Sequence, residues 1–307
     1  MAPISCLRTT GLEKNKMRDI IGTTFADVYE SLLNDVYNHY EYETAPRGMN
    51  IREITNCALV IRNPYSNLFK NDVRNLPLKY LKKELALYLS GRNDVDGFGN
   101  ASKFWKKIAN DDGTVNSAYG NLIFKMTDTP EGKTQWEWMI ESLIKDKDSR
   151  QAIMHFNQPV HQYSGVKDFP CTLEMTFHIR NDKLNATTTM RSNDVIKGTT
   201  FDVPFFTLLQ QMALDVLRHK AYPELQMGSY THIAHSMHLY ESDFELVGNM
   251  LKNSFIPDAM PRITDASEIL ASQKLFSDIV DGGENSEFRT VILENAAFIN
   301  WLRTGID

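Results

Sequence analysis

Two runs of strand-forming residues joined by a tight turn constrain this chain more than any other feature. Residues 172–180 and 184–191 have the period of strands, and Asn181-Asp182 stands between them. Asparagine and aspartate are common turn residues, so the pattern predicts an antiparallel hairpin. Cys171 precedes the first run and Arg191 ends the second. We therefore expect Cys171 and Arg191 at adjacent ends of paired strands.

The residues around Cys171 predict a rigid entry to its strand. Pro170 fixes its own φ and biases Phe169 toward extended geometry. The thiolate is the reactive form of cysteine, and a nearby guanidinium lowers the pKa of a thiol, so Arg191 is a candidate activator. A lone cysteine beside an apolar strand is more often an inert core residue. Cys171 alone therefore identifies no chemistry.

The remaining periodicities predict an α+β organisation. Apolar residues from Phe25 to Tyr40 recur at helical spacing after Thr23-Thr24, which can cap a helix. Further helices are expected at 78–90, 101–109, 134–145, 203–219, 238–253, 265–280 and 286–303, and further strands at 52–62, 151–157 and 226–234. Pro257 and Pro261 break the chain. We expect a catalytic domain at 1–256 and a helical C-terminal extension at 257–307 that packs on the same domain.

The composition narrows the class of protein. With 307 residues, of which 42% are hydrophobic, the chain can bury a large core. A net charge of −6 argues against a nucleic-acid-binding surface but allows a local cationic pocket for one phosphate. The 3 cysteines lack metal-ligand spacing, so neither disulfides nor a metal are expected. No apolar run has the length of a membrane span, which predicts a soluble, cytoplasmic protein.

An ordered set of motifs gives the chain a family resemblance. The most specific is Arg191-Ser192-Asn193-Asp194 followed by Gly198 and Phe201. The other motifs are Asn75-Leu-Pro-Leu78 with Glu84, Asn116-Ser-Ala-Tyr119-Gly120, Asp148-Ser-Arg150 and His238-Leu-Tyr240. In these the chain resembles the thymidylate synthase family, which methylates a pyrimidine nucleotide at C5 with 5,10-methylenetetrahydrofolate. The resemblance implies a thymidylate synthase-like fold, with a mixed or antiparallel sheet flanked by helices.

Position 202 narrows the substrate that the resemblance implies. Thymidylate synthases have asparagine there, whereas this chain has Asp202. A carboxyl group suits cytosine, because one oxygen accepts from the N4 amino group and a raised pKa lets the other share a proton with N3. An ionised Asp202 facing uracil would oppose O4, acceptor against acceptor. Thr172 stands where thymidylate synthases usually have histidine, and Met190 where they usually have glutamine. The chain therefore resembles the deoxycytidylate (or cytidylate) 5-hydroxymethylase branch, which implies a bacterium or a phage-infected host as its source.

The resemblance also implies a mechanism. The Cys171 thiolate adds to C6 of the pyrimidine, C5 takes up one carbon from the folate, and water completes a hydroxymethyl group while tetrahydrofolate leaves. Asp202 reads the base, and Glu84 organises the water and moves protons. A lone glutamate on a helix is by default a solvated charge, so the role of Glu84 depends on the motif.

Binding roles follow from the same resemblance. The implied substrate-binding residues are Arg47, Arg150, Arg191, Ser192, Asp202, His238 and Tyr240, and the implied folate-binding residues are Trp105, Asp194, Glu84 and Tyr119. Arg150 would serve the phosphate site of the neighbouring subunit in a homodimer. Gln151 departs from the usual second arginine, and Lys197 is a candidate replacement. A tryptophan on an apolar helix face is more often core than cofactor platform, which leaves Trp105 open.

Several alternatives remain open at the level of sequence. The product could be a methyl group on dCMP or dUMP, and the substrate could be CMP as readily as dCMP. A catalytically idle nucleotide-binding or assembly module is a reading of another class. A cysteine hydrolase would pair Cys171 with His155 or His178, although no ordered partner is visible. The extension after Pro257 either enlarges the fold or admits water to the intermediate.

Overall fold

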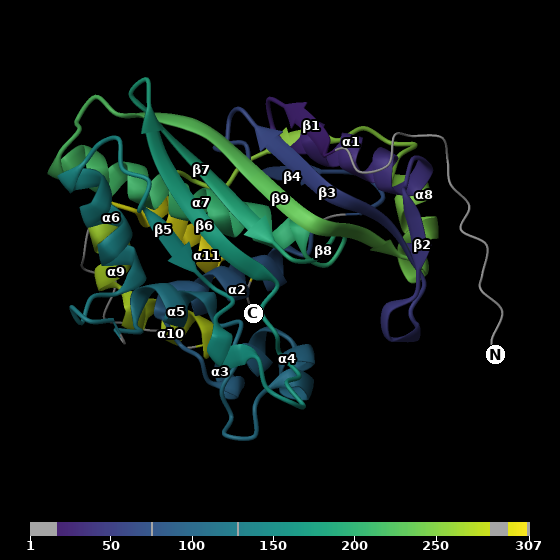
Figure 1. Cartoon of the computed structure of the whole chain (residues 1–307), viewed down its shortest axis with the longest axis horizontal. Helices are drawn as coiled ribbons and strands as arrows, with labels where there is room; N and C mark the ends of the chain where they lie inside the picture. The colour runs from purple at the N-terminus through teal and green to yellow at the C-terminus, as the bar shows by residue number, and fades with distance from the viewer. Residues whose placement is uncertain (1–16, 75, 128, 283–293, 306–307) are drawn as a thin grey trace. The chain divides into compact units, whose positions relative to one another are not determined.

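The computed structural model describes residues 17–74, 76–127, 129–282 and 294–305 (Figure 1). The chain divides into two compact units. Unit 1 comprises the described parts of Met1–Leu76, Thr189–Pro204 and Ser229–Ala259, and unit 2 those of Pro77–Thr188, Phe205–Gly228 and Met260–Asp307. Within the described residues, no helix is long and apolar enough to cross a membrane.

Unit 1 is organised around strand β3 (Ile51–Ile61). β1 (Arg18–Gly22) runs parallel to β3, and β9 (Gln226–Tyr240) runs antiparallel to it. β8 (Asn193–Asp194) is parallel to β9, so this part of the sheet is mixed. The other elements of unit 1 are α1 (Phe25–Asn38), β2 (Tyr42–Thr44), η1 (Pro46–Gly48), β4 (Leu68–Lys70), η3 (Glu241–Asp243), α8 (Phe244–Met250) and β10 (Ile256–Asp258).

Helix α1 confirms the helix expected after Thr23-Thr24. Thr24 is its N-cap, and its hydroxyl accepts from Asp27 N–H at 3.2 Å while the Asp27 carboxylate accepts from Thr24 N–H at 2.8 Å. This reciprocal pair satisfies two backbone donors at the start of the helix. The apolar face of α1 is buried and packs on β3.

Unit 2 contains the hairpin expected from the sequence. β6 (Thr172–Arg180) and β7 (Lys183–Met190) are neighbours, and Asn181 and Asp182 between them have φ of 50° and 55°. β5 (Ile153–His155) pairs antiparallel with β6 on its other side. The left-handed turn residues are those that a two-residue hairpin requires. Cys171 directly precedes β6 and Arg191 directly follows β7, as expected.

Helices make up most of the rest of unit 2. They are α2 (Leu78–Ser90), α3 (Val95–Ala101), α4 (Lys103–Ile108), α5 (Tyr119–Phe124), α6 (Gln135–Lys145), η2 (Pro159–His161), the larger part of α7 (Thr199–Lys220), α9 (Ala266–Ala271), α10 (Gln273–Val280) and α11 (Ala296–Arg303). α2 contacts α5, and both α10 and α11 pack on α2. The C-terminal segment is therefore helical, and the described part of it after Met260 belongs to unit 2.

Some sequence expectations are wrong in their boundaries. The helix expected at 238–253 covers only Phe244–Met250, because β9 continues to Tyr240, which pairs with Ile51 of β3. The helix expected at 203–219 starts four residues earlier, at Thr199, and passes through Pro204. The helix expected at 101–109 is two short helices that meet at Ser102. Residues 286–293 of the helix expected at 286–303 lie outside the described residues.

Candidate active site

Cys171 lies on a loop that is fixed at several points. Its side chain is half-buried, between Pro170 and the start of β6. The Asn157 amide donates to Pro170 O at 2.8 Å. Two bonds to the Tyr119 hydroxyl hold the next residue, because Thr172 N–H lies 3.3 Å and Thr172 Oγ1 3.0 Å from it. The rigid strand entry that Pro170 predicted is thus held by bonds on both sides of the cysteine.

A buried carboxylate fixes the same loop three residues before the cysteine. Asp168 is 4% exposed and accepts from Ser117 N–H at 2.7 Å and from the Ser117 hydroxyl at 2.5 Å. The Asn116 amide donates to Asp168 O at 2.8 Å. Burial raises the pKa of Asp168, and the two bonds from Ser117 oppose this shift. The Asn116-Ser117 pair and Tyr119 therefore anchor the cysteine loop, a role that the sequence did not reveal.

Gly120 allows this anchor to lie against α2. A Cβ atom at Gly120 would stand 1.7 Å from Tyr88 O, so no other residue fits. The close approach lets the Tyr119 and Tyr88 rings stack with centroids 5.4 Å apart. Tyr119 was expected to bind folate, and in the structure Thr172 donates to its hydroxyl.

Glu84 is buried on α2. It is 8% exposed, which excludes a solvated helix charge. Its Oε1 accepts from the Tyr80 hydroxyl at 2.8 Å and from the Tyr88 hydroxyl at 3.4 Å. The Trp105 indole N–H points to the Tyr80 hydroxyl at 3.3 Å, so the tryptophan belongs to the same hydrogen-bonded group. Trp105 is 7% exposed and packs edge to face on Phe98, which leaves little of its ring for a cofactor.

Asp202 lies in the first turn of α7. Its Oδ2 accepts from the Asn193 amide at 2.7 Å. Burial raises the pKa of Asp202 to about 7, the Asn193 bond lowers it and the charge of Asp194 raises it further. A carboxyl group in this state changes protonation near neutral pH, as the sequence argument requires of a group that shares a proton with cytosine N3.

His238 stands between two carboxylates of unit 1. It pairs across the sheet with Glu53 on one side and with Asp194 on the other. Burial lowers the pKa of His238, and the charge of Asp194 opposes this. The His238 and Tyr240 rings meet edge to face at 5.1 Å. Because β9 continues to Tyr240, both residues are carried by a strand and not by the helix that the sequence predicted.

Asp194 and Lys197 use their charged groups within unit 1. Asp194 Oδ1 accepts from Ile196 N–H at 2.7 Å and Lys197 N–H at 3.0 Å, and Oδ2 bonds to no group among the described residues. The latter oxygen leaves an acceptor for a ligand N–H. Lys197 Nζ forms an ion pair with Asp243 at 2.7 Å, so this cation is already neutralised and is a poor replacement for the arginine absent at Gln151.

Two candidate phosphate-binding arginines differ in setting. Arg191 is half-buried and directly follows β7, next to the half-buried Ser192. Arg47 is exposed in the turn η1, where Arg47 and Gly48 have φ of 55° and 78°. Its charge acts on His238, where it helps to lower the pKa. Arg47 and His238 therefore belong to one electrostatic neighbourhood.

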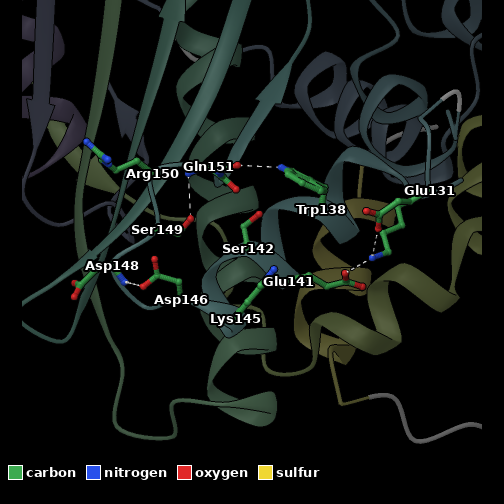
Figure 2. A pocket seen from close by; sticks show the side chains of 11 residues that line it. Glu131, Trp138, Glu141, Ser142, Lys145, Asp146, Asp148, Ser149, Arg150 and Gln151 are labelled. Atoms are coloured by element: carbon green, nitrogen blue, oxygen red, sulfur yellow. Dashed lines mark hydrogen bonds and ion pairs between the residues drawn. The ribbon is translucent and has the colours of Figure 1, made fainter.

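Arg150 is exposed at the edge of an open cleft of about 750 Å³ on unit 2 (Figure 2). The cleft is lined by α6 and the segments before and after it, and Trp138 donates to Gln151 O at 3.1 Å. Its charged residues are of both signs: Glu131, Lys133, Glu141, Lys145, Asp146, Asp148 and Arg150. Of the site residues expected from sequence, only Arg150 lines it, so we do not place the reaction there.

Each unit thus gathers part of the expected site. Unit 1 brings Asp202, Asp194 and His238 together, with Arg47 near them. Unit 2 joins Glu84 to Trp105 through Tyr80. The sequence analysis gave no role to the polar side chains behind these residues, chiefly Asn193 and His232 in unit 1. No group of three or more His, Cys, Asp or Glu in the described part of the chain is arranged to hold a metal ion.

Comparisons with known proteins show the family of the chain. The profile of the family described as "Thymidylate synthase" matches residues 27–281. The deoxycytidylate 5-hydroxymethyltransferase of Enterobacteria phage T4 is 29% identical over 211 residues, which are 67% of this chain and 82% of that protein. The deoxyuridylate hydroxymethyltransferase of Bacillus phage SP01 is 27% identical over 271 residues, 81% of this chain and 67% of that protein.

A solved structure shares the fold. The thermostable thymidylate synthase A from Bacillus subtilis superposes with a TM-score of 0.63 at 20% sequence identity, covering 80% of this chain and 91% of that one. This likeness confirms the fold class expected from the sequence, with its mixed sheet flanked by helices.

Proposed function

The chain belongs to the thymidylate synthase family, whose members are one-carbon transferases, and from this we propose that it is a cytidylate 5-hydroxymethyltransferase. The reaction would convert dCMP or CMP, methylenetetrahydrofolate and water to the 5-hydroxymethyl nucleotide and tetrahydrofolate. The family uses methylenetetrahydrofolate as a co-substrate. The observation that carries the proposal is Asp202, a carboxyl group with a pKa of about 7 that one amide donor orients.

The state of Asp202 favours cytosine over uracil. Its Oδ2 is an acceptor and can take a hydrogen bond from the N4 amino group as well as from Asn193. Its Oδ1 bonds to no group among the described residues, and near neutral pH it can carry the proton that N3 accepts. Ionised Asp202 would face uracil O4 with no donor, which costs about 1–3 kcal/mol for each unpaired group.

The chain's own residues can supply the covalent steps. The Cys171 thiolate forms a bond to C6 and the C5–C6 double bond opens, so that C5 becomes the nucleophile. Methylenetetrahydrofolate supplies the carbon that C5 takes up. The C5 proton leaves to a base and the bond from the new carbon to the folate nitrogen breaks, which releases tetrahydrofolate and leaves an exocyclic methylene. Water adds to this methylene, and the Cys171 sulfur departs as the C5–C6 double bond re-forms. Glu84, hydrogen-bonded to two tyrosines, is the proposed carrier of these protons.

The residues fit a folate co-substrate in part. The second oxygen of Asp194 is an acceptor for a pterin N–H. Trp105 is too buried to offer its whole ring, and its position beside Tyr80 supports a role in holding the Glu84 group. Tyr119 supports the cysteine loop. Asp194 is therefore the strongest of the proposed folate-binding residues.

A second candidate is hydroxymethylation of deoxyuridylate. The relative from Bacillus phage SP01 is described as acting on deoxyuridylate, and this chain aligns with it over 81% of its own length. Protonated Asp202 could donate to uracil O4, so the choice of base depends on which carboxyl oxygen holds the proton. Methyl transfer and an idle binding module remain further alternatives.

The decisive experiment measures the product. The full-length protein would be incubated with methylenetetrahydrofolate and dCMP, CMP or dUMP, and the products analysed by mass spectrometry. We expect cytidylate to gain the mass of CH2O while absorbance of dihydrofolate does not appear. A methyl product with dihydrofolate would replace hydroxymethylation by methylation. Cys171→Ala should abolish either product, and turnover that survives this change would contradict the covalent mechanism.

The base preference has its own test. Asp202→Asn should move the kcat/KM ratio toward dUMP by about tenfold to a hundredfold, because an asparagine amide can donate to O4 and accept from N3–H. Glu84→Gln is the matched control, since it also replaces a buried carboxylate by an amide and should slow both nucleotides without changing their ratio. An unchanged ratio in Asp202→Asn would show that another residue reads the base.

A further inference from the structure

A series of buried, hydrogen-bonded polar side chains leads to Asp202 in unit 1. Asn193 is 3% exposed, and His232, Tyr230 and Thr199 are each 0% exposed. His232 Nε2 lies 3.2 Å from Asn193 Oδ1, and the Tyr230 hydroxyl lies 2.9 Å from His232 Nδ1. The Thr199 hydroxyl also donates to Asn193 Oδ1. The last hydrogen bond of this series runs from Asn193 Nδ2 to Asp202 Oδ2 at 2.7 Å.

The protonation state of His232 decides which group donates in each of these hydrogen bonds. Burial lowers the pKa of His232 to about 3, so the ring is neutral and carries one N–H. Asn193 Oδ1 can only accept, so the hydrogen is on Nε2. Nδ1 is then an acceptor and takes the hydrogen of the Tyr230 hydroxyl. Every bond from Tyr230 through His232 and Asn193 therefore donates toward Asp202.

Two donors hold the Asn193 amide in one orientation. Turning the amide over would place its oxygen against the ionised Asp202 carboxylate, acceptor against acceptor. Gly198 leaves room for the amide in this position, since a Cβ at residue 198 would stand only 2.8 Å from Asn193 Nδ2. Asn193 thus presents a fixed N–H to Asp202 Oδ2.

This fixed donor distinguishes the two oxygens of Asp202. An oxygen that accepts a hydrogen bond is the poorer site for a proton, because a hydroxyl oxygen accepts less well than a carbonyl or carboxylate oxygen. We propose that Asn193 is a specificity-determining positioning residue, which His232 and Thr199 orient so that Oδ2 of Asp202 stays an acceptor and Oδ1 carries the proton shared with cytosine N3. The substrate in this statement rests on the proposed function, whereas the assignment of the proton does not.

The first test observes Asp202 in the ligand-free protein. Carbon NMR of side-chain-labelled aspartate would follow its titration, and the signal that Asp202→Asn removes identifies it. His232→Phe loses the donor to Asn193, and His232→Gln keeps an N–H at the position of Nε2. We expect the Asp202 midpoint to rise by about 0.5–1 pH unit in His232→Phe, the size of one lost hydrogen bond to a carboxylate. In His232→Gln it should stay near the wild-type value.

Two features make this titration interpretable. His232 itself titrates far below the range observed, and Asp194 of β8, the charged neighbour that also raises the pKa of Asp202, is unchanged in every variant. Should His232→Phe fail to fold, Thr199→Val removes the other donor to Asn193 with little change in shape and should raise the midpoint in the same direction. Equal midpoints in wild type, His232→Phe and Thr199→Val would overturn the proposal.

The second test measures base selection with the same proteins. The ratio of kcat/KM for dCMP to that for dUMP should fall about fivefold to tenfold in His232→Phe and be restored in His232→Gln. A shifted titration with no cytidylate activity in wild type would refute the proposed function and keep the proton assignment. If the protein acts on cytidylate but neither its base selection nor the Asp202 titration changes in the His232 and Thr199 variants, the proposed function stands and the proton assignment is refuted.

Discussion

At the scale of single residues, Asp202 is a carboxyl group held in a state that costs folding free energy. Its pKa is about 7 in the folded protein against an ordinary value of 3.8. The folded state therefore keeps a proton on Asp202 at pH values where the unfolded chain has lost it. Between these two values the folded state binds more protons, so the free energy of unfolding falls as the pH rises. Such a cost is typical of groups retained for function.

A variant at this position makes the cost measurable. The residue at 202 in Asp202→Asn does not titrate. The free energy of unfolding of this variant minus that of wild type should therefore increase as the pH rises from about 4 to about 7 and stay constant above that. Urea denaturation across this range checks the result. His232 lowers the free energy of unfolding of both proteins as the pH falls below 6.5, because its pKa is lowered in the folded state. This effect is equal in the two proteins and cancels in their difference. Parallel curves for the two proteins would contradict the raised pKa.

At the scale of elements, the sequence predicted what local pattern determines. The hairpin followed from Asn181-Asp182, and the capped start of α1 from Thr24, because both signals lie within a few residues of their effect. Strand β9 was cut short because its last residues pair with β3, far away in the sequence. The hydrogen bond from His232 to Asn193 joins residues 39 apart in the sequence, so no local pattern predicts it. The family motif predicted a role for Glu84. Its partners Tyr80 and Tyr88 each lie four residues from it, a spacing that puts them on the same face of the helix.

The C-terminal helices support the element that carries Glu84. α10 and α11 pack on α2, where Lys82 Nζ donates to Thr304 O at 2.7 Å and lies 4.8 Å from the Trp301 ring. Beyond the other end of α2, Arg92 forms an ion pair with Asp281 at 2.9 Å. The extension therefore holds α2 at both ends. Deleting it would expose the apolar face of α10 and its partners, so point variants test its role better than truncation.

The packing of α10 gives a prediction for this element. Phe276 is 0% exposed, and Phe276→Ala should lower the free energy of unfolding by about 3–5 kcal/mol. Lys274→Ala on the exposed face of the same helix is the matched control and should change it by less than about 0.5 kcal/mol. Chemical denaturation followed by circular dichroism measures both. If the two variants were equally stable, the extension would not be part of the folded core of unit 2.

At the scale of the whole molecule, the open question is whether one chain makes a complete site. Arg150 is exposed, and no hydrogen bond or ion pair holds its guanidinium to other described residues. A cation presented in this way suits a phosphate that another copy of the chain binds, as the family resemblance implies for a homodimer. Two inactive variants, Cys171→Ala and Arg150→Ala, distinguish a shared site from a self-contained one.

Mixing the two variants should restore activity if Arg150 serves the neighbouring subunit. In a mixed dimer, the intact Cys171 of one chain meets the intact Arg150 of the other, so one of its two sites is complete. Random exchange of equal amounts makes half of the dimers mixed, and activity should reach about a quarter of that of wild type. If Arg150 served its own chain, each site of the mixed dimer would lack one residue and mixing would restore nothing. Sedimentation of the mixture shows that dimers form, and Lys145→Ala in place of Arg150→Ala controls for loss of any positive charge at the cleft, because that variant should remain active by itself.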